Sequence, residues 1–221
     1  MHDVVVLFDV DNTLLDNERV TDDLHGYLEH EIGAGQAGEY FALFEELRRE
    51  LGYADYLGAL QRFRIAHPHE LRVLRASSWL VDYPFADRLY PGALDVLARL
   101  SSVGPTVILT DGDVVFQPRK IERSGILAAV DGRVLVYVHK ERELADVERR
   151  FPARRYVLVD DKLRILAAVK DAWGDRLTTV FPRQGHYAHD PATNAAYPEA
   201  DIADFAVDAI ADLLQLDLGL I

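Results

Sequence analysis

Hydrophobic positions along this chain fall into two kinds of pattern. Short apolar runs rich in Val, Ile and Leu occupy residues 4–8, 106–109, 134–138, 156–159 and 177–181. Runs this short and β-branched are typical of strands that are buried on both faces. From residue 93 onward, segments with helical apolar spacing alternate with these runs, at residues 93–100, 114–123, 141–150 and 163–172. The alternation predicts an α/β fold in which helices cover both faces of a parallel sheet.

The segment between the first and second runs has a different pattern. Residues 17–84 contain no convincing strand, but large apolar residues recur there at helical spacing, as in Tyr40, Phe44, Leu47 and Leu51. Such stripes are most simply the packed faces of helices. We therefore predict an inserted helical subdomain over residues 17–84, and an α/β core formed by residues 1–16 and 85–221.

The C-terminal part of the chain predicts one more strand and one more helix. The run at 177–181 is expected to be the final strand of the sheet. Residues 198–214 are expected to contain the last helix, with Ile202, Phe205, Ile210 and Leu213 on its buried side.

Composition and charge exclude several classes of function. The chain has 221 residues, 49% of them hydrophobic, and a formal net charge of −13 at pH 7. Because such a field repels polyanions, neither nucleic acid nor an anionic membrane is expected as a partner. The absence of cysteine excludes disulfides, thiolate metal sites and cysteine nucleophiles. We see neither a signal peptide nor a membrane-spanning run, and so expect a cytoplasmic protein.

Polar residues follow four of the predicted strands directly. The first strand ends in Asp9 and Asp11, and the others end in Thr110, in Lys140 and in Asp160-Asp161. Alternate residues of an extended chain lie on one side, so Asp9 and Asp11 are expected to point the same way. Because ligands bind beyond the carboxyl ends of parallel strands, these residues should share one edge of the sheet. Oxygen ligands of this kind suit Mg²⁺.

This set of residues suits phosphoryl transfer. A metal neutralises phosphate and carboxylates, a lysine and a hydroxyl bind the remaining oxygens, one carboxylate attacks, and another donates a proton. Each feature also has a simpler reading as a strand-end turn or a helix cap. Lys162, which follows the acidic pair, competes with Lys140 for the role of the lysine.

The motif D-V-D-N-T at residues 9–13, followed in order by Thr110, Lys140 and Asp160-Asp161, resembles the four motifs of the haloacid dehalogenase superfamily. The resemblance covers nearly the whole chain. It implies a Rossmann-like, three-layer core with a helical cap of the C1 type inserted soon after the first strand. That position matches the predicted helical subdomain.

The resemblance also implies a role for each residue of the site. Asp9 would be the nucleophile that forms an aspartyl-phosphate, and Asp11 the general acid and then base. Thr110, Lys140 and the backbone near Asp111 and Gly112 would bind the phosphoryl group. The implied cofactor is Mg²⁺, and its implied ligands are Asp9, the backbone carbonyl of Asp11, Asp160 and Asp161.

Asp11 separates the branches of this superfamily. In the family that this chain resembles, members of the phosphatase branch carry the motif D-x-D, as here. Members that cleave carbon–halogen bonds carry D-x-Y instead. We therefore expect a Mg²⁺-dependent hydrolase of a small phosphorylated metabolite. A phosphotransferase or mutase of the same family stays open, as does a non-catalytic phosphate-binding module. His186, after the last predicted strand, is a candidate for the mouth of the substrate site.

Overall fold

The computed structural model describes residues 1–217, except for the side chains of residues 192–194. Its centre is a parallel sheet with the strand order β3-β2-β1-β4-β5-β6, six strands within that described range. The strands are β1 His2–Phe8, β2 Thr106–Asp111, β3 Val134–Tyr137, β4 Ala153–Val159, β5 Leu177–Pro182 and β6 Phe205–Val207. The predicted α/β class is confirmed.

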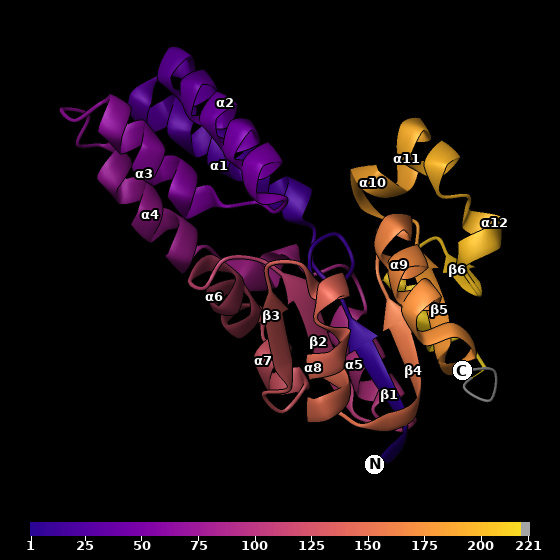
Figure 1. The fold of residues 1–221 in the computed structure, drawn as a ribbon. Coiled ribbons are helices and arrows are strands. Elements are labelled where there is room, and N and C mark those ends of the chain that lie inside the picture. Colours follow the sequence, from indigo (N-terminus) through magenta and orange to yellow (C-terminus); the bar gives the residue numbers. More distant parts are fainter. Residues whose placement is uncertain (218–221) are drawn as a thin grey trace.

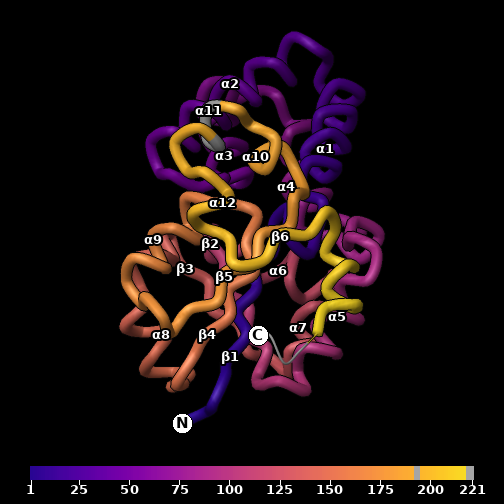
Figure 2. Tube along the Cα trace, turned by 90° about the vertical axis from the view of Figure 1, so that its right-hand side faces the viewer, coloured from indigo at the N-terminus to yellow at the C-terminus, as the bar shows by residue number. Residues whose placement is uncertain are grey.

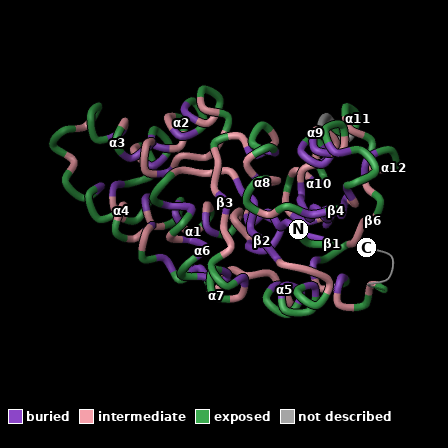
Figure 3. Tube along the Cα trace, turned by 60° about the horizontal axis from the view of Figure 1, so that its bottom comes forward, coloured by how far each residue is buried: buried purple, intermediate pink, exposed green. Residues whose placement is uncertain are grey.

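The sheet separates two hydrophobic layers. On β1, Val4, Val6 and Phe8 pack into one cluster, whereas Val5 and Leu7 pack into the other. This is the alternation expected of a strand that is buried on both faces. The first cluster includes residues from α5 Ala93–Leu100, α6 Phe116–Arg123 and α7 Ile126–Ala129. The second includes residues from α8 Leu144–Arg150 and α9 Leu163–Trp173. The core therefore has the three layers that the pattern predicted, and Figure 3 shows buried positions on the central strands β2 and β4 as well as on the helices.

Helices α1 to α4 form a body of their own beyond one end of the sheet (Figure 1). They are α1 Asn17–Ile32, α2 Ala34–Leu51, α3 Tyr56–Ala66 and α4 Val73–Asp82, all inserted between β1 and β2. We call this body the cap. Helix α1 begins at Asn17 because the side chain of Asp16 accepts a hydrogen bond from the backbone N–H of Arg19. The chain thus turns from strand to helix within a few residues of Asp9 and Asp11.

The segment after β5 differs from its prediction. Residues 198–214 form α12 Glu199–Ile202, β6 Phe205–Val207 and the 3-10 turn η4 Ile210–Leu214, instead of one helix. Ile202, Ile210 and Leu213 are buried as predicted, but β6 pairs with the free edge of β5, so β5 is not the final strand. Pairing with an open sheet edge overrides local helical spacing in so short a segment.

Two further short helices, α10 Gly185–His189 and α11 Pro191–Ala196, lead from β5 toward the cap (Figure 2). The backbone N–H and the ring Nδ1 of His186 both lie within 2.6 Å of the Oε1 of Glu18 on α1. The guanidinium of Arg48 on α2 lies 5.6 Å from the ring centre of Tyr187. These contacts join α10 to the cap. In the part of the chain that the structure describes, we find no helix long and apolar enough to cross a bilayer.

Candidate active site

The strand order brings the four predicted motifs together. Strands β3, β2, β1 and β4 are neighbours, so Lys140, Thr110, Asp9 and Asp160 lie at the ends of adjacent strands. All four of these residues are buried, as is Asp161. They come from distant parts of the sequence and share one edge of the sheet because parallel strands end on the same side.

Lys140 reaches across this edge from the end of β3, an outermost strand, to Asp9 and Asp160. It begins the 3-10 turn η2 Lys140–Arg142 directly after β3, and its side chain is 1% exposed. Its Nζ donates to the Oδ1 of Asp9 at 2.6 Å and lies 2.6 Å from the Oδ2 of Asp160. A buried ammonium is tolerated only where such charged partners offset its lost hydration. Lys140 therefore holds Asp9 and Asp160 in place.

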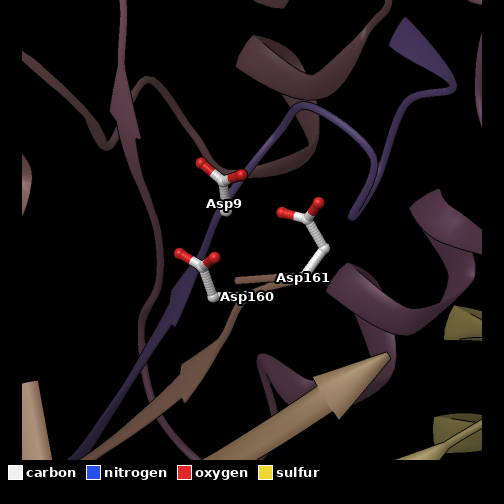
Figure 4. A group of neighbouring side chains, drawn as sticks. All are labelled: Asp9, Asp160 and Asp161. Atoms are coloured by element: carbon white, nitrogen blue, oxygen red, sulfur yellow. The ribbon is translucent and has the colours of Figure 1, made fainter. Parts of the chain in front are cut away.

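The carboxylates of Asp9, Asp160 and Asp161 form a compact cluster (Figure 4). One oxygen each from Asp9, Asp160 and Asp161 lies within 4.8 Å of the other two. The Oδ2 of Asp9 and both oxygens of Asp161 are buried without a hydrogen-bond partner among the described residues. Orphaned buried oxygens of this kind fit a hard divalent cation such as Mg²⁺, which takes carboxylate ligands. The donor set thus fits the expected metal.

The pKa values of the three carboxyl groups reflect an excess of negative charge in the cluster. Burial raises the pKa of Asp9, but the ammonium groups of Lys140 and Lys162 outweigh it and hold that pKa below its usual value. Burial raises the pKa of Asp161 well above the usual value, and Lys162 offsets this only in part. Burial also raises the pKa of Asp160, despite its contact with Lys140. The ionised cluster therefore needs more positive charge than the nearby lysines supply.

The carboxylate of Asp11 lies outside this cluster. Its Oδ1 accepts a hydrogen bond from the Nζ of Lys120 at 2.6 Å, and its Oδ2 lies 3.4 Å from the Nε2 of Gln117. Asp9 and Asp11 thus bind different lysines. The contact between the backbone carbonyl of Asp11 and a metal, which the family resemblance implied, stays a prediction.

The three consecutive residues expected to bind phosphate have distinct environments. The Oγ1 of Thr110 accepts a hydrogen bond from the Nε2 of Gln117 at 3.0 Å. The Oδ1 of Asp111 accepts one from the backbone N–H of Lys140 at 2.6 Å, and burial raises the pKa of Asp111. The backbone N–H of Gly112 donates to the carbonyl of Tyr137 at 3.0 Å. That amide is occupied in this arrangement, so the phosphate contact of Gly112 stays a prediction.

Lys162 takes a position different from that of Lys140. Its Nζ lies 5.4 Å from the ring centre of Tyr187, and the side chain lines a cavity between the cap and the core. The cavity has a volume of about 800 Å³ and is also lined by Asp11, Tyr56 and His186. The geometry favours Lys140 over Lys162 as the lysine that holds Asp9. His186 lines the cavity, as the sequence indicated.

Three residues next to Asp11 were missed by sequence reasoning. Lys120 and Gln117 lie on α6, and Asn17 is the first residue of α1. The Nζ of Lys120 donates to the Oδ1 of Asn17 at 2.8 Å as well as to Asp11. The rarity of lysine in this chain, with four in all, was the one available signal for Lys120.

Comparisons with known proteins agree with this architecture. Residues 4–181 match the family model described as haloacid dehalogenase-like hydrolase. A solved structure described as a haloacid dehalogenase-like hydrolase, from Burkholderia xenovorans LB400, is 60% identical, with a TM-score of 0.93 over 98% of this chain and 100% of that chain. A comparison with curated proteins found no match.

More distant structures share the fold. YfnB from Bacillus subtilis, solved with bound magnesium, is 16% identical, with a TM-score of 0.65 over 97% of this chain and 98% of that chain. L-2-haloacid dehalogenase from Xanthobacter autotrophicus, solved with covalently bound chloropropionic acid, is 20% identical. Its TM-score is 0.59 over 98% of each chain. At these identities the likeness concerns the fold alone.

Proposed function

This chain belongs to the haloacid dehalogenase-like hydrolase family, and on that basis we propose that it is a Mg²⁺-dependent phosphomonoester hydrolase acting on a small phosphorylated metabolite. The observation that carries the proposal is the arrangement of two carboxylates on one loop. Asp9 is buried and paired with Lys140, whereas Asp11 lines the cavity between the cap and the core. A nucleophile and a proton donor in these positions are what transfer of a phosphoryl group to an enzyme carboxylate needs.

Asp9 is the nucleophile in this proposal. One carboxylate oxygen is held by Lys140, and the other has no hydrogen-bond partner among the described residues. In the first step an oxygen of Asp9 forms a bond to phosphorus while the bond from phosphorus to the leaving oxygen breaks. Asp11 gives its proton to that leaving oxygen, which departs as an alcohol.

The second step releases phosphate. A water molecule attacks the aspartyl-phosphate and gives a proton to the carboxylate of Asp11, while the bond between phosphorus and Asp9 breaks. Phosphate leaves, and Asp9 and Asp11 return to their starting states. Lys140 and Thr110 bind phosphoryl oxygens in both steps, which keeps the phosphorus in line with the attacking oxygen.

Asp9, Asp160, Asp161 and the backbone carbonyl of Asp11 would hold Mg²⁺. When bound, the ion supplies positive charge that neutralises the phosphate and the carboxylates. The raised pKa of Asp161 and the orphaned oxygens of the cluster support this assignment.

The position of the cap is evidence that the substrate is small. The cavity of about 800 Å³ lies between the cap and the core, and Thr21, Phe44 and Tyr56 of the cap line it. A cap in this position excludes bulk water and limits the size of the leaving group. A phosphorylated metabolite fits such a space better than a phosphoprotein does.

Phosphate release from a panel of phosphorylated metabolites and one aryl phosphate tests the proposal. We expect release with Mg²⁺, none with a chelator, and none from Asp9→Asn. Release of chloride from 2-chloropropionate, with no phosphate from any ester, would instead favour a dehalogenase. A phosphorylated isomer formed without free phosphate would favour a mutase.

A further inference from the structure

Lys120 is a buried cation outside the predicted motifs. It lies on α6, and its side chain is 1% exposed. Its Nζ donates to the Oδ1 of Asp11 at 2.6 Å and to the Oδ1 of Asn17 at 2.8 Å, and lies 5.1 Å from the ring centre of Phe116. Burying an ammonium is costly unless its N–H groups find acceptors. Here one of the two acceptors is the carboxylate proposed as the proton donor.

Helix α6 fixes both oxygens of that carboxylate. Lys120 holds the Oδ1 of Asp11, and the Nε2 of Gln117, three residues earlier on the same helix, lies 3.4 Å from its Oδ2. The amide of Gln117 is oriented in turn by its hydrogen bond to the Oγ1 of Thr110. Two donors on one rigid helix therefore define the plane of the Asp11 carboxylate.

Asn17 orients the lysine from the cap side. Its Nδ2 donates to the Oη of Tyr56 at 3.1 Å, and its backbone N–H donates to the Oδ1 of Asn12 at 3.1 Å. Since Nδ2 is engaged by Tyr56, the Oδ1 of Asn17 is the atom left to accept from Lys120. The ammonium is thus held between the first turn of the cap and the loop that carries Asp11.

We infer that Lys120 is the positioning residue of the proton donor: it holds the carboxyl of Asp11 at the position from which the leaving oxygen is protonated. This inference rests on the proposed function. The side chain of Asp11 is 23% exposed and lines the cavity, so the hydrogen bond from Lys120 is what fixes its direction there. A general acid works only within hydrogen-bond reach of the atom that it protonates.

The chemistry of the leaving group separates this role from a purely structural one. An alkyl phosphate needs a proton on its leaving oxygen, whereas 2,4-dinitrophenyl phosphate releases a stable phenolate without one. The ratio kcat/KM covers the steps up to departure of the leaving group, so it excludes the later hydrolysis of the aspartyl-phosphate. Attack of Asp9 on phosphorus is common to both esters.

The test is kcat/KM of Lys120→Met for both esters at saturating Mg²⁺. We expect a fall of about 100-fold for the alkyl phosphate, the lower end of the range of general acid catalysis, and of less than about 3-fold for the dinitrophenyl ester. Lys120→Arg should recover part of the loss for the alkyl ester. Lys170→Met, which removes a lysine paired with Asp204 away from this site, is the matched control and should change neither value.

A double variant shows whether Lys120 acts through Asp11. In the Asp11→Asn background, Lys120→Met should cost less than about 2-fold more, because residues that act as a unit are not additive. Equal losses for the two esters, or full additivity with Asp11→Asn, would overturn the inference. Melting curves of each variant identify any loss of activity that comes from unfolding. If Lys120→Met is unfolded, the two esters are compared with Lys120→Arg instead. If the wild type hydrolyses neither ester, the proposed function is wrong, and so is this inference, which rests on it.

Discussion

Lys140 and Asp9 are 131 positions apart in the sequence, yet the Nζ of one lies 2.6 Å from the Oδ1 of the other. Both side chains are almost completely buried. Burial lowers the pKa of Lys140, but Asp160 and Asp9 outweigh it and hold that pKa above its usual value. The lysine is therefore charged at every pH at which the protein would be assayed, and Asp9 is held in its ionised, nucleophilic form.

Lys140→Met should remove both stability and activity. The change leaves Asp9 and Asp160 buried without their cation, and breaking a buried pair costs about 3–5 kcal/mol. We expect the free energy of unfolding in urea to fall by that amount in the absence of Mg²⁺. Phosphate release should fall at least about 100-fold at saturating Mg²⁺, because a preorganised charge at the reacting group is lost. Wild-type activity in the folded variant would contradict the assignment of Lys140.

Lys162→Met is the matched comparison, with a different expected result. The Nζ of Lys162 lies over the ring of Tyr187, and the side chain lines the cavity between the cap and the core. Loss of a cation from the cavity wall should weaken binding of an anionic substrate more than it slows chemistry. Because Lys162 also helps Lys140 to keep Asp9 ionised, we expect KM to rise about 10-fold and kcat to fall by less than about 10-fold, well below the loss in Lys140→Met. A collapse of kcat with KM unchanged would assign Lys162, rather than Lys140, to the reacting phosphoryl group.

Asp161→Asn should raise the stability of the metal-free protein. Both oxygens of Asp161 are buried without a hydrogen-bond partner among the described residues, and burial raises the pKa of the group well above its usual value. An acid whose pKa is raised on folding costs stability as pH rises through its unfolded pKa, so the neutral amide removes that cost at pH 7. We expect the melting temperature without Mg²⁺ to rise by about 2–4 °C, the shift of about 1 kcal/mol in a chain of this size.

The same variant should respond less to Mg²⁺. A ligand that binds only the folded state stabilises it by about 2.7 kcal/mol at one hundred times its dissociation constant. We therefore expect Mg²⁺ to raise the melting temperature of the wild type, and to raise that of Asp161→Asn by less than half as much. A full Mg²⁺ response in Asp161→Asn would place the ion elsewhere. Asp22→Asn, which replaces another aspartate of the cavity wall away from the carboxylate cluster, is the control.

The strand-end residues were predictable because their signals are local. An apolar run followed by Asp9, Thr110, Lys140 or Asp160 is visible in a few adjacent positions, and parallel topology alone brings such ends together. The position of Lys120 was not predictable in this way. It depends on the rotation of α6 about its axis and on where the cap places Asn17, and both are results of packing.

The C-terminal segment shows the other limit of the sequence pattern. Ile202 and Ile210 were correctly predicted as buried, but the element between them is a strand. With Phe205 and Val207 on β6, the alternation spans three residues, too few for a period of two to be distinguished from helical spacing. This segment forms a strand because it pairs with the free edge of β5. That pairing depends on another part of the chain, so the segment's own sequence does not reveal it.

Asp204 anchors this edge strand and gives a prediction that depends on pH. Its Oδ2 accepts a hydrogen bond from the backbone N–H of Thr179 on β5 at 2.8 Å, and its Oδ1 accepts one from Lys170 at 2.7 Å. Burial raises the pKa of Asp204, but the hydrogen bonds from Lys170 and Thr179 outweigh it and hold that pKa below its usual value of 3.8. The ionised side chain therefore stabilises the pairing of β5 and β6.

Asp204→Asn should destabilise the protein near neutral pH but not in acid. Because the pKa of Asp204 is lower in the folded state, its contribution is complete above pH 3.8, the unfolded value, and is lost as pH falls through the folded value. We expect a loss of about 1–2 kcal/mol in urea unfolding at pH 7, at the lower end because the group is 38% exposed and screened by water. The difference between wild type and variant should shrink below about pH 4, where the wild-type carboxyl takes up a proton. Lys170→Met removes one partner and should give a smaller loss with the same pH dependence. A difference that persists unchanged into acid would mean that the amide perturbs packing at this edge and that the charge of Asp204 does not stabilise it.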